Sequence, residues 1–172
     1  MSKQRVVKAV ALVITGLWVT AASATVEIKF ITPEEFSDVR DSGFGRSETL
    51  AGIEAHLQTL AASQFGATAS GKDLLIEVTD IDRAGELEPW GRDMREIRVL
   101  RAVGRPAISL RYVVSEGGRE VQRGEAKLSD LSYLDRLNRY PSGDPIRFEK
   151  RMLDDWFSKE FAAAPVVAAK QP

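Results

Sequence analysis

The strongest constraint on the fold of this chain is a pair of β-strands joined by two glycines. Four apolar residues alternate with more polar ones, as in a strand with one buried face: Ile108, Leu110, Tyr112 and Val114. Gly117 and Gly118 follow and can form the tight turn of a hairpin. The returning strand, about residues 120–128, is weakly patterned and contains Gly124, so we expect an edge or bulged strand.

Three further segments are predicted to be strands. In residues 26–30 and 74–78, apolar residues occupy every second position. Residues 94–103 fit both a strand and one face of a helix. Their β-branched residues and the nearby Pro106 favour a strand.

Two segments are predicted to be helices. Apolar residues recur at helical spacing between 47 and 65, with Ser47 as the expected N-cap and Gly66 as the end. A second helix is expected to begin at Asp144-Pro145 and to run to about residue 161, with Trp156 in the core. Residues 129–144 predict a short helical turn and a loop. This order of elements predicts a two-layer α+β domain, in which a mostly antiparallel sheet of about four or five strands carries a long helix and a C-terminal helix on one face.

The N-terminus has the pattern of an export signal. Lys3, Arg5 and Lys8 precede an uncharged, mostly apolar run over residues 9–22, and Ala22-Ser23-Ala24 fits a cleavage site. We therefore predict a signal peptide over residues 1–24, a single domain over 25–161 and a disordered tail over 162–172. A lone N-terminal membrane anchor is the alternative, although the run is shorter than the roughly 20 residues that a span needs.

Composition limits the compartment and the partners. The chain has no cysteine, and an exported protein without disulfides suggests the bacterial periplasm. Cleavage after Ala24 would leave 21 basic and 25 acidic residues, a net charge of −4. Nucleic acid does not suit this charge, and after cleavage no membrane-spanning segment is expected. The expected partner is therefore an envelope protein or a lipid.

The stretch VTDIDRAGELEP, residues 78–89, is the first candidate site. If the strand before it continues, Asp80 and Asp82 project from one face, and Glu86 or Glu88 can fold back after Gly85. Such oxygen ligands suit Ca²⁺ or Mg²⁺, and two carboxylates could also serve acid/base hydrolysis. The alternative is that these acids bond backbone donors and nearby arginines as the chain leaves the sheet.

A second candidate is an interaction surface. Arg92, Arg95 and Arg98 could bind phosphate or lipid headgroups, or form a solvated, salt-bridged face. Lys150 and Asp154 lie four residues apart on the C-terminal helix, are expected to pair, and would add to a charged recognition face.

Several classes of enzyme are disfavoured. The chain has no nucleophile elbow, Walker loop or dinucleotide fingerprint, and no thiol. His56 is the only histidine, and its position beside the apolar stripe predicts a partly exposed side chain rather than a metal ligand.

Three segments carry a resemblance to a known family. VEIKFITPEEFSD, VTDIDRAGE and IRFEKRMLDDWF resemble the bacterial exported family called domain of unknown function 3016, over about residues 26–161. Arg83 stands where such members carry an apolar residue, which argues against a buried position. The resemblance implies an exported single domain and no mechanism. We therefore expect a non-enzymatic binding or accessory module of the cell envelope, with a carboxylate-based or metal-assisted hydrolase centred on Asp80 and Asp82 as the alternative.

Overall fold

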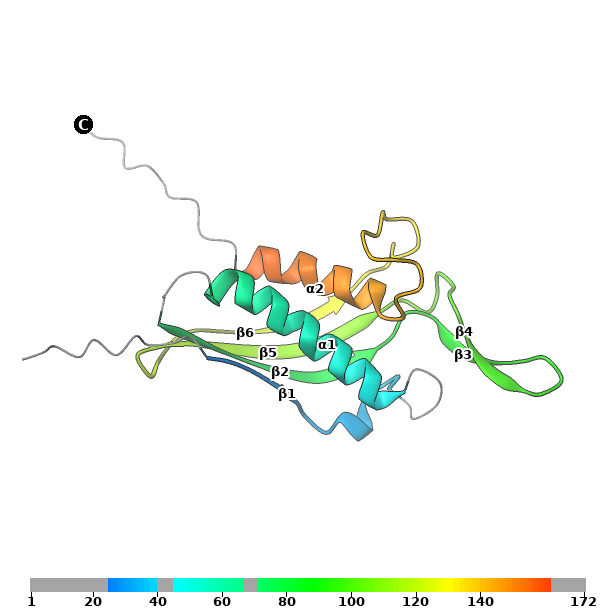
Figure 1. Ribbon diagram of the computed structural model, residues 1–172, viewed down its shortest axis with the longest axis horizontal. Helices are drawn as coiled ribbons and strands as arrows, with labels where there is room; N and C mark the ends of the chain where they lie inside the picture. The colour runs from blue at the N-terminus through cyan, green and yellow to red at the C-terminus, as the bar shows by residue number, and fades with distance from the viewer. Residues whose placement is uncertain (1–24, 40–44, 67–70, 162–172) are drawn as a thin grey trace, which may run out of the picture.

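The computed structural model describes residues 25–39, 45–66 and 71–161 (Figure 1). They form a four-stranded sheet with two helices on one face, and a separate two-stranded sheet that projects from one end. The predicted α+β class is confirmed. The predicted signal peptide and the predicted C-terminal tail lie outside the described residues.

The four-stranded sheet has the order β1-β2-β5-β6. Its strands are β1 (Val26–Phe30), β2 (Lys72–Asp82), β5 (Ala107–Glu116) and β6 (Arg119–Ser129). The pairs β2–β5 and β5–β6 are antiparallel, whereas β1 pairs with β2 in parallel. A parallel pair needs a long crossover, and the long helix provides it. The sheet is therefore mixed, with antiparallel pairs in the majority.

A bulge in β2 decides which face its acids occupy. Leu74, Ile76 and Val78 are buried, so a strict two-residue period would place Asp80 in the core. The pairing shifts between Val78 and Asp80, which leaves one residue unopposed, and it is then Ile81 that is fully buried. Asp80 and Asp82 consequently lie on the face opposite the helices.

The β5–β6 hairpin forms as predicted. Gly117 and Gly118 have φ values of 57° and 76°, which glycine adopts without strain. The edge strand β6 carries a bulge opposite Val114 and Ser115. A Cβ atom at Gly124 would lie 2.6 Å from the ring of Tyr112, so this glycine makes room for a core aromatic.

Two α-helices cover the sheet. They are α1 (Arg46–Ala61), which continues as a π-helical turn η2 (Ala62–Gly66), and α2 (Arg147–Glu160); a 3₁₀ turn, η1 (Pro33–Glu35), follows β1. Two predicted caps are wrong. The N-cap of α1 is Gly45 rather than Ser47, and that of α2 is Ile146 rather than Asp144. Asp144 instead accepts the Ile146 N–H at 3.0 Å, which shapes the turn before the helix.

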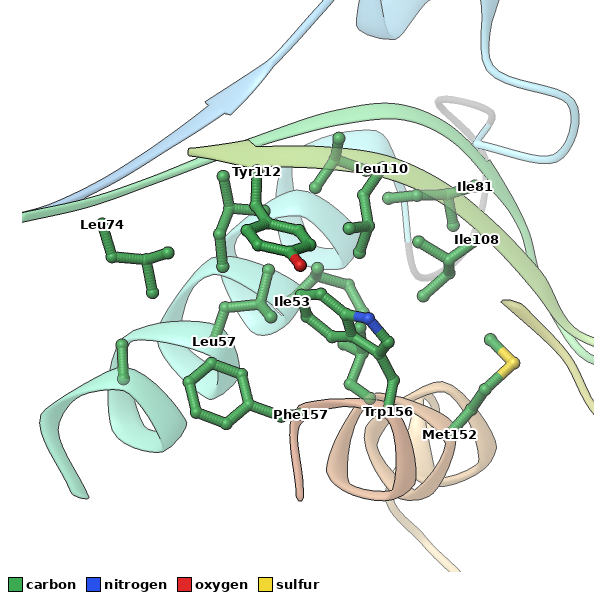
Figure 2. Packing of buried hydrophobic residues seen from close by; sticks show 14 of the residues in the cluster. Ile53, Leu57, Leu74, Ile81, Ile108, Leu110, Tyr112, Met152, Trp156 and Phe157 are labelled. Carbon is green, nitrogen blue, oxygen red and sulfur yellow. The ribbon is translucent and has the colours of Figure 1, made fainter. Parts of the chain in front are cut away.

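The main core lies between the sheet and both helices (Figure 2). Ile53 and Leu57 of α1 and Leu153 of α2 are fully buried, and each such burial stabilises the fold by about 1.5–3 kcal/mol. Trp156 packs against Tyr112 with ring centroids 6.0 Å apart, which confirms its core position. Val26, Ile28 and Phe30 of β1 pack against this core, so a chain that starts at Thr25 contains every described residue that forms or contacts it.

The two-stranded sheet consists of β3 (Glu86–Trp90) and β4 (Arg95–Val99). We call residues 86–99 the arm. The arm extends away from the end of the main sheet (Figure 1). Within the ambiguous segment 94–103, residues 95–99 form β4, so the strand prediction is confirmed for that part.

Candidate functional site

The acidic stretch at the end of β2 bonds the segment that follows β1. Asp80 Oδ1 accepts the Ser37 N–H at 2.8 Å, and Oδ2 accepts the Ser37 hydroxyl at 2.9 Å. Both carboxylate oxygens of Asp80 are thus bonded to the chain that follows β1. This geometry gives Asp80 a structural role of the kind that the alternative interpretation of the stretch predicts.

Asp82 lies at a small polar cavity beside Asp80. The cavity has a volume of about 270 Å³ and is lined by Ser37, Asp38, Asp82, Gly85, Glu86 and Leu87. Burial raises the pKa of the Asp82 carboxyl, and the negative charges of Asp38 and Asp80 raise it further. Among the residues that the structure describes, no three His, Cys, Asp or Glu side chains are placed to hold a metal ion. The geometry therefore adds no support to the predicted ion site at Asp80, Asp82 and Glu86.

Arg98 fixes the base of the arm. Its Nη1 donates to Asp38 Oδ2 at 2.6 Å and to the carbonyl of Gly85 at 2.9 Å. Because one side chain of β4 bonds both the body and the start of the arm, it restrains the direction in which the arm points. Arg98 is thus a largely buried connection and not part of an exposed surface.

Two buried polar side chains, Arg83 and Glu149, lie close to the base of the arm. The expectation that Arg83 is not buried is wrong. Arg83 is only 5% exposed, and its guanidinium donates to the Pro145 carbonyl at 3.2 Å. Glu149 is 1% exposed and accepts the Ala84 N–H at 2.7 Å. Burial raises the pKa of Glu149 and lowers the pKa of Arg83. The segments VTDIDRAGE and IRFEKRMLDDWF therefore contact each other through buried polar groups.

His56 is partly exposed, as predicted, although most of its side chain is covered. Its side chain is 9% exposed and its Nε2 lies 2.9 Å from Asp154 Oδ1. The Tyr140 hydroxyl donates to Asp154 Oδ2 at 2.7 Å. Burial lowers the pKa of His56, although the Asp154 carboxylate partly opposes the shift. Sequence reasoning missed this cluster because the helical pattern of α1 alone does not show that α2 packs beside His56.

The expected pair of Lys150 with Asp154 does not form. Lys150 Nζ lies 2.6 Å from Asp144 Oδ2, while Asp154 pairs with Arg139 and His56. Asp154 is buried. Lys150 and Asp154 therefore belong to internal polar contacts around α2 and do not form an exposed recognition face.

Exposed apolar side chains gather at the arm end of the molecule. The large hydrophobic residues that are exposed among the described residues are Trp90, Met94, Ile97, Leu100, Val103, Val121, Leu131, Leu134 and Leu137. Except for Val121 on β6, all of them lie in residues 90–103 or 131–137. We call these eight residues the apolar end.

The two segments of the apolar end are neighbours in space. The Tyr133 hydroxyl donates to the carbonyl of Arg101 at 2.6 Å, which joins the turn at 131–137 to the chain that follows the arm. Figure 1 shows this turn and the arm at the same end of the molecule. Arg92 and Arg95 are exposed near the tip and form no ion pair within the described part of the chain. Trp, Met and Arg are the residue types that contact surfaces favour.

The fold and these contacts define an α+β domain with a mixed sheet, two helices on one face and a projecting hairpin arm. The chain belongs to the family of proteins of unknown function DUF3016, whose model matches residues 24–159. The predicted family is thereby confirmed. No curated protein and no solved structure matches the chain. Within the described ranges, no helix has the length and apolar character that crossing a membrane requires.

Proposed function

We propose that the protein is an exported, non-enzymatic binding or accessory module of the bacterial cell envelope, and that it uses the apolar end as its contact surface in the periplasm. The pattern of residues 1–24 and the absence of cysteine support the compartment. The gathering of exposed hydrophobic side chains at one end of the molecule supports the contact surface and carries the proposal.

Hydrophobic side chains that remain in water cost free energy. Single exposed hydrophobic residues are ordinary, but a concentration of them marks an interaction site. Trp90 is 65% exposed at the far end of β3, where no packing within the domain requires a tryptophan. Contact with a partner would remove this apolar area from water and stabilise the complex.

The polar contacts near the end of β2 support a binding module rather than an enzyme. Asp80, Arg98 and Glu149 are each engaged in contacts that hold the domain together. His56, the only histidine of the chain, bonds Asp154. These groups stabilise the fold and the base of the arm.

One observation favours the hydrolase as a second candidate. Asp82 lines a cavity, and its raised pKa is typical of a general acid. Asp80 is less suited to be its catalytic partner, because both of its oxygens accept bonds from Ser37. If this candidate is correct, a substrate screen finds a compound that the wild type hydrolyses. Asp82→Asn then abolishes this hydrolysis without unfolding the domain.

In-cell photo-crosslinking tests the proposal. A benzophenone amino acid replaces Trp90 in the full chain, and the same amino acid replaces Val121, which is 50% exposed but lies on β6 close to the β5–β6 turn, outside the apolar end. We expect the protein in the periplasmic fraction and a crosslinked product from position 90 but not from position 121. Retention in the cytoplasm contradicts the compartment, and equal products from both positions, or none from position 90, contradict the contact surface.

A further inference from the structure

We infer that the apolar end docks on a bilayer surface that contains anionic phospholipid; this rests on the proposed function and names its partner. The protruding shape of the apolar end, the residue types at its tip and two exposed arginines there, Arg92 and Arg95, support the inference (Figure 1).

The shape favours a soft surface. The arm projects, and the turn at 131–137 lies on the outside of the same end (Figure 1). Leu137 is 96% exposed and Val103 is 82% exposed, so these side chains stand out singly from the surface. A protein partner would need a recess for each such side chain, whereas the headgroup region of a bilayer adapts to them.

The tip combines the two kinds of side chain that the membrane surface attracts. Trp90 is the last residue of β3, and Met94 is the last residue of the turn that joins β3 and β4. Tryptophan partitions to the boundary between lipid and water. Arg92 lies in this turn, and Arg95 is paired with Trp90 in the arm register. Their guanidinium groups form no ion pair within the described residues and can therefore bind lipid phosphates in a fork geometry.

Charges near the tip of the arm favour docking through this end of the molecule. Residues 86–105, which include the whole arm, contain five arginines and four carboxylates, a net charge of +1, in a chain whose total is −1. Within this segment Arg101 is paired with Glu88, and Arg98 is paired with Asp38 of the body. Arg92 and Arg95 at the tip are therefore the arginines that an anionic surface attracts, whereas the remainder of the chain is net negative.

Vesicle binding of the chain from Thr25 to Pro172 tests the inference, because this chain contains every residue that the structure describes. It contains only two tryptophans, Trp90 and Trp156, of which Trp156 is buried. A change in emission therefore reports on Trp90. The probes are phosphatidylcholine vesicles with and without phosphatidylglycerol. We expect co-sedimentation and a blue shift of Trp90 emission with the anionic vesicles, and neither with the neutral ones.

Matched variants locate the contact. Arg92→Glu should lower the partition coefficient roughly five- to thirtyfold, because each arginine near an anionic surface contributes to binding. The control is Arg119→Glu in the β5–β6 turn, at the opposite end of the sheet, which should have no effect (Figure 1). Trp90→Ser should weaken binding and Val121→Ser should not. Circular dichroism checks that each variant is folded.

Absence of binding to anionic vesicles, or binding that Arg92→Glu leaves unchanged, overturns the lipid inference. If a crosslinker at position 90 nevertheless captures a discrete protein in cells, the proposed binding module stands with a protein partner. If position 90 captures nothing and the vesicles do not bind, both proposals fail.

Discussion

Replacement of Glu149 tests whether its buried polar contacts hold the segments VTDIDRAGE and IRFEKRMLDDWF together. Glu149→Ala removes the acceptor of the Ala84 N–H, and an unpaired buried donor costs about 1–3 kcal/mol. The same change deletes side-chain atoms at a position that is 1% exposed, which leaves a cavity. We expect a total loss of about 3 kcal/mol, which corresponds to a fall in melting temperature of about 10 °C for a domain of this size. Glu149→Gln keeps an acceptor oxygen and should lose only about 1 kcal/mol.

The pH dependence of the Glu149→Gln variant follows from the raised pKa of Glu149. Above the ordinary pKa of 4.5 the unfolded chain ionises this carboxyl, while the folded chain still binds its proton. The wild type therefore loses stability as the pH rises through this window, and the glutamine variant does not. The stability difference between wild type and variant should narrow as the pH rises.

Urea denaturation of both variants at several pH values measures these effects. The control is Glu48→Ala, which removes an exposed glutamate from the first turn of α1, as Glu149 lies in the first turn of α2. This control should change the free energy of unfolding by less than about 1 kcal/mol. The structural role of Glu149 is contradicted if Glu149→Ala lowers the free energy of unfolding no more than the control does. It is also contradicted if the difference in this free energy between the wild type and the glutamine variant widens with rising pH.

Four other perturbations have defined outcomes. Because the pKa of His56 is lowered from 6.5, the unfolded chain gains a proton first and stability falls as the pH drops below 6.5; His56→Gln should reduce this dependence in urea titrations. Gly124→Ala should cost about 1–3 kcal/mol in the same assay through overpacking. Arg98→Ala should accelerate amide hydrogen exchange in the arm more than in the main sheet. Ca²⁺ and Mg²⁺ should leave the melting temperature of the wild type unchanged, and also that of the double variant Asp80→Asn, Asp82→Asn.

Each of these outcomes has a contrary result. Gly143→Ala has open space around the new methyl group, so an equal loss there contradicts the overpacking argument for β6. A pH profile that the histidine substitution leaves unchanged contradicts the lowered pKa. Uniform exchange rates after loss of Arg98 contradict its role at the arm base. A metal-induced rise in melting temperature that the asparagine variant loses restores the predicted ion site.

The sequence predicted the elements whose patterns are local. The alternation at 108–114 and the two glycines after it specify the hairpin regardless of what surrounds it. The apolar spacing of α1 likewise locates the helix, although Gly45 rather than Ser47 is its N-cap. Such features depend on neighbours within a few residues, and a sequence shows those directly.

The candidate site could not be predicted in the same way because it depends on long-range contacts. A bulge at residue 79 turns Asp80 away from the core, and no local pattern shows it. Most of the His56 side chain is covered, and it bonds Asp154, a residue 98 positions away. Arg83 is buried because Pro145 and Glu149 supply its polar surroundings. Only the exposed arginines near the arm tip, Arg92 and Arg95, keep the interaction role that the sequence suggested, and that role remains a proposal.

The absence of cysteine allows the most direct measurement of the central claim, that a partner covers the apolar end in the cell. Met94→Cys and Val121→Cys each introduce a single thiol at an exposed apolar position, one inside the apolar end and one outside it. Both thiols should react with a membrane-impermeant maleimide in the purified protein. In cells with a permeabilised outer membrane, we predict that the thiol at position 94 is protected and that the thiol at position 121 reacts as before. Equal reaction at the two positions in cells would contradict the account.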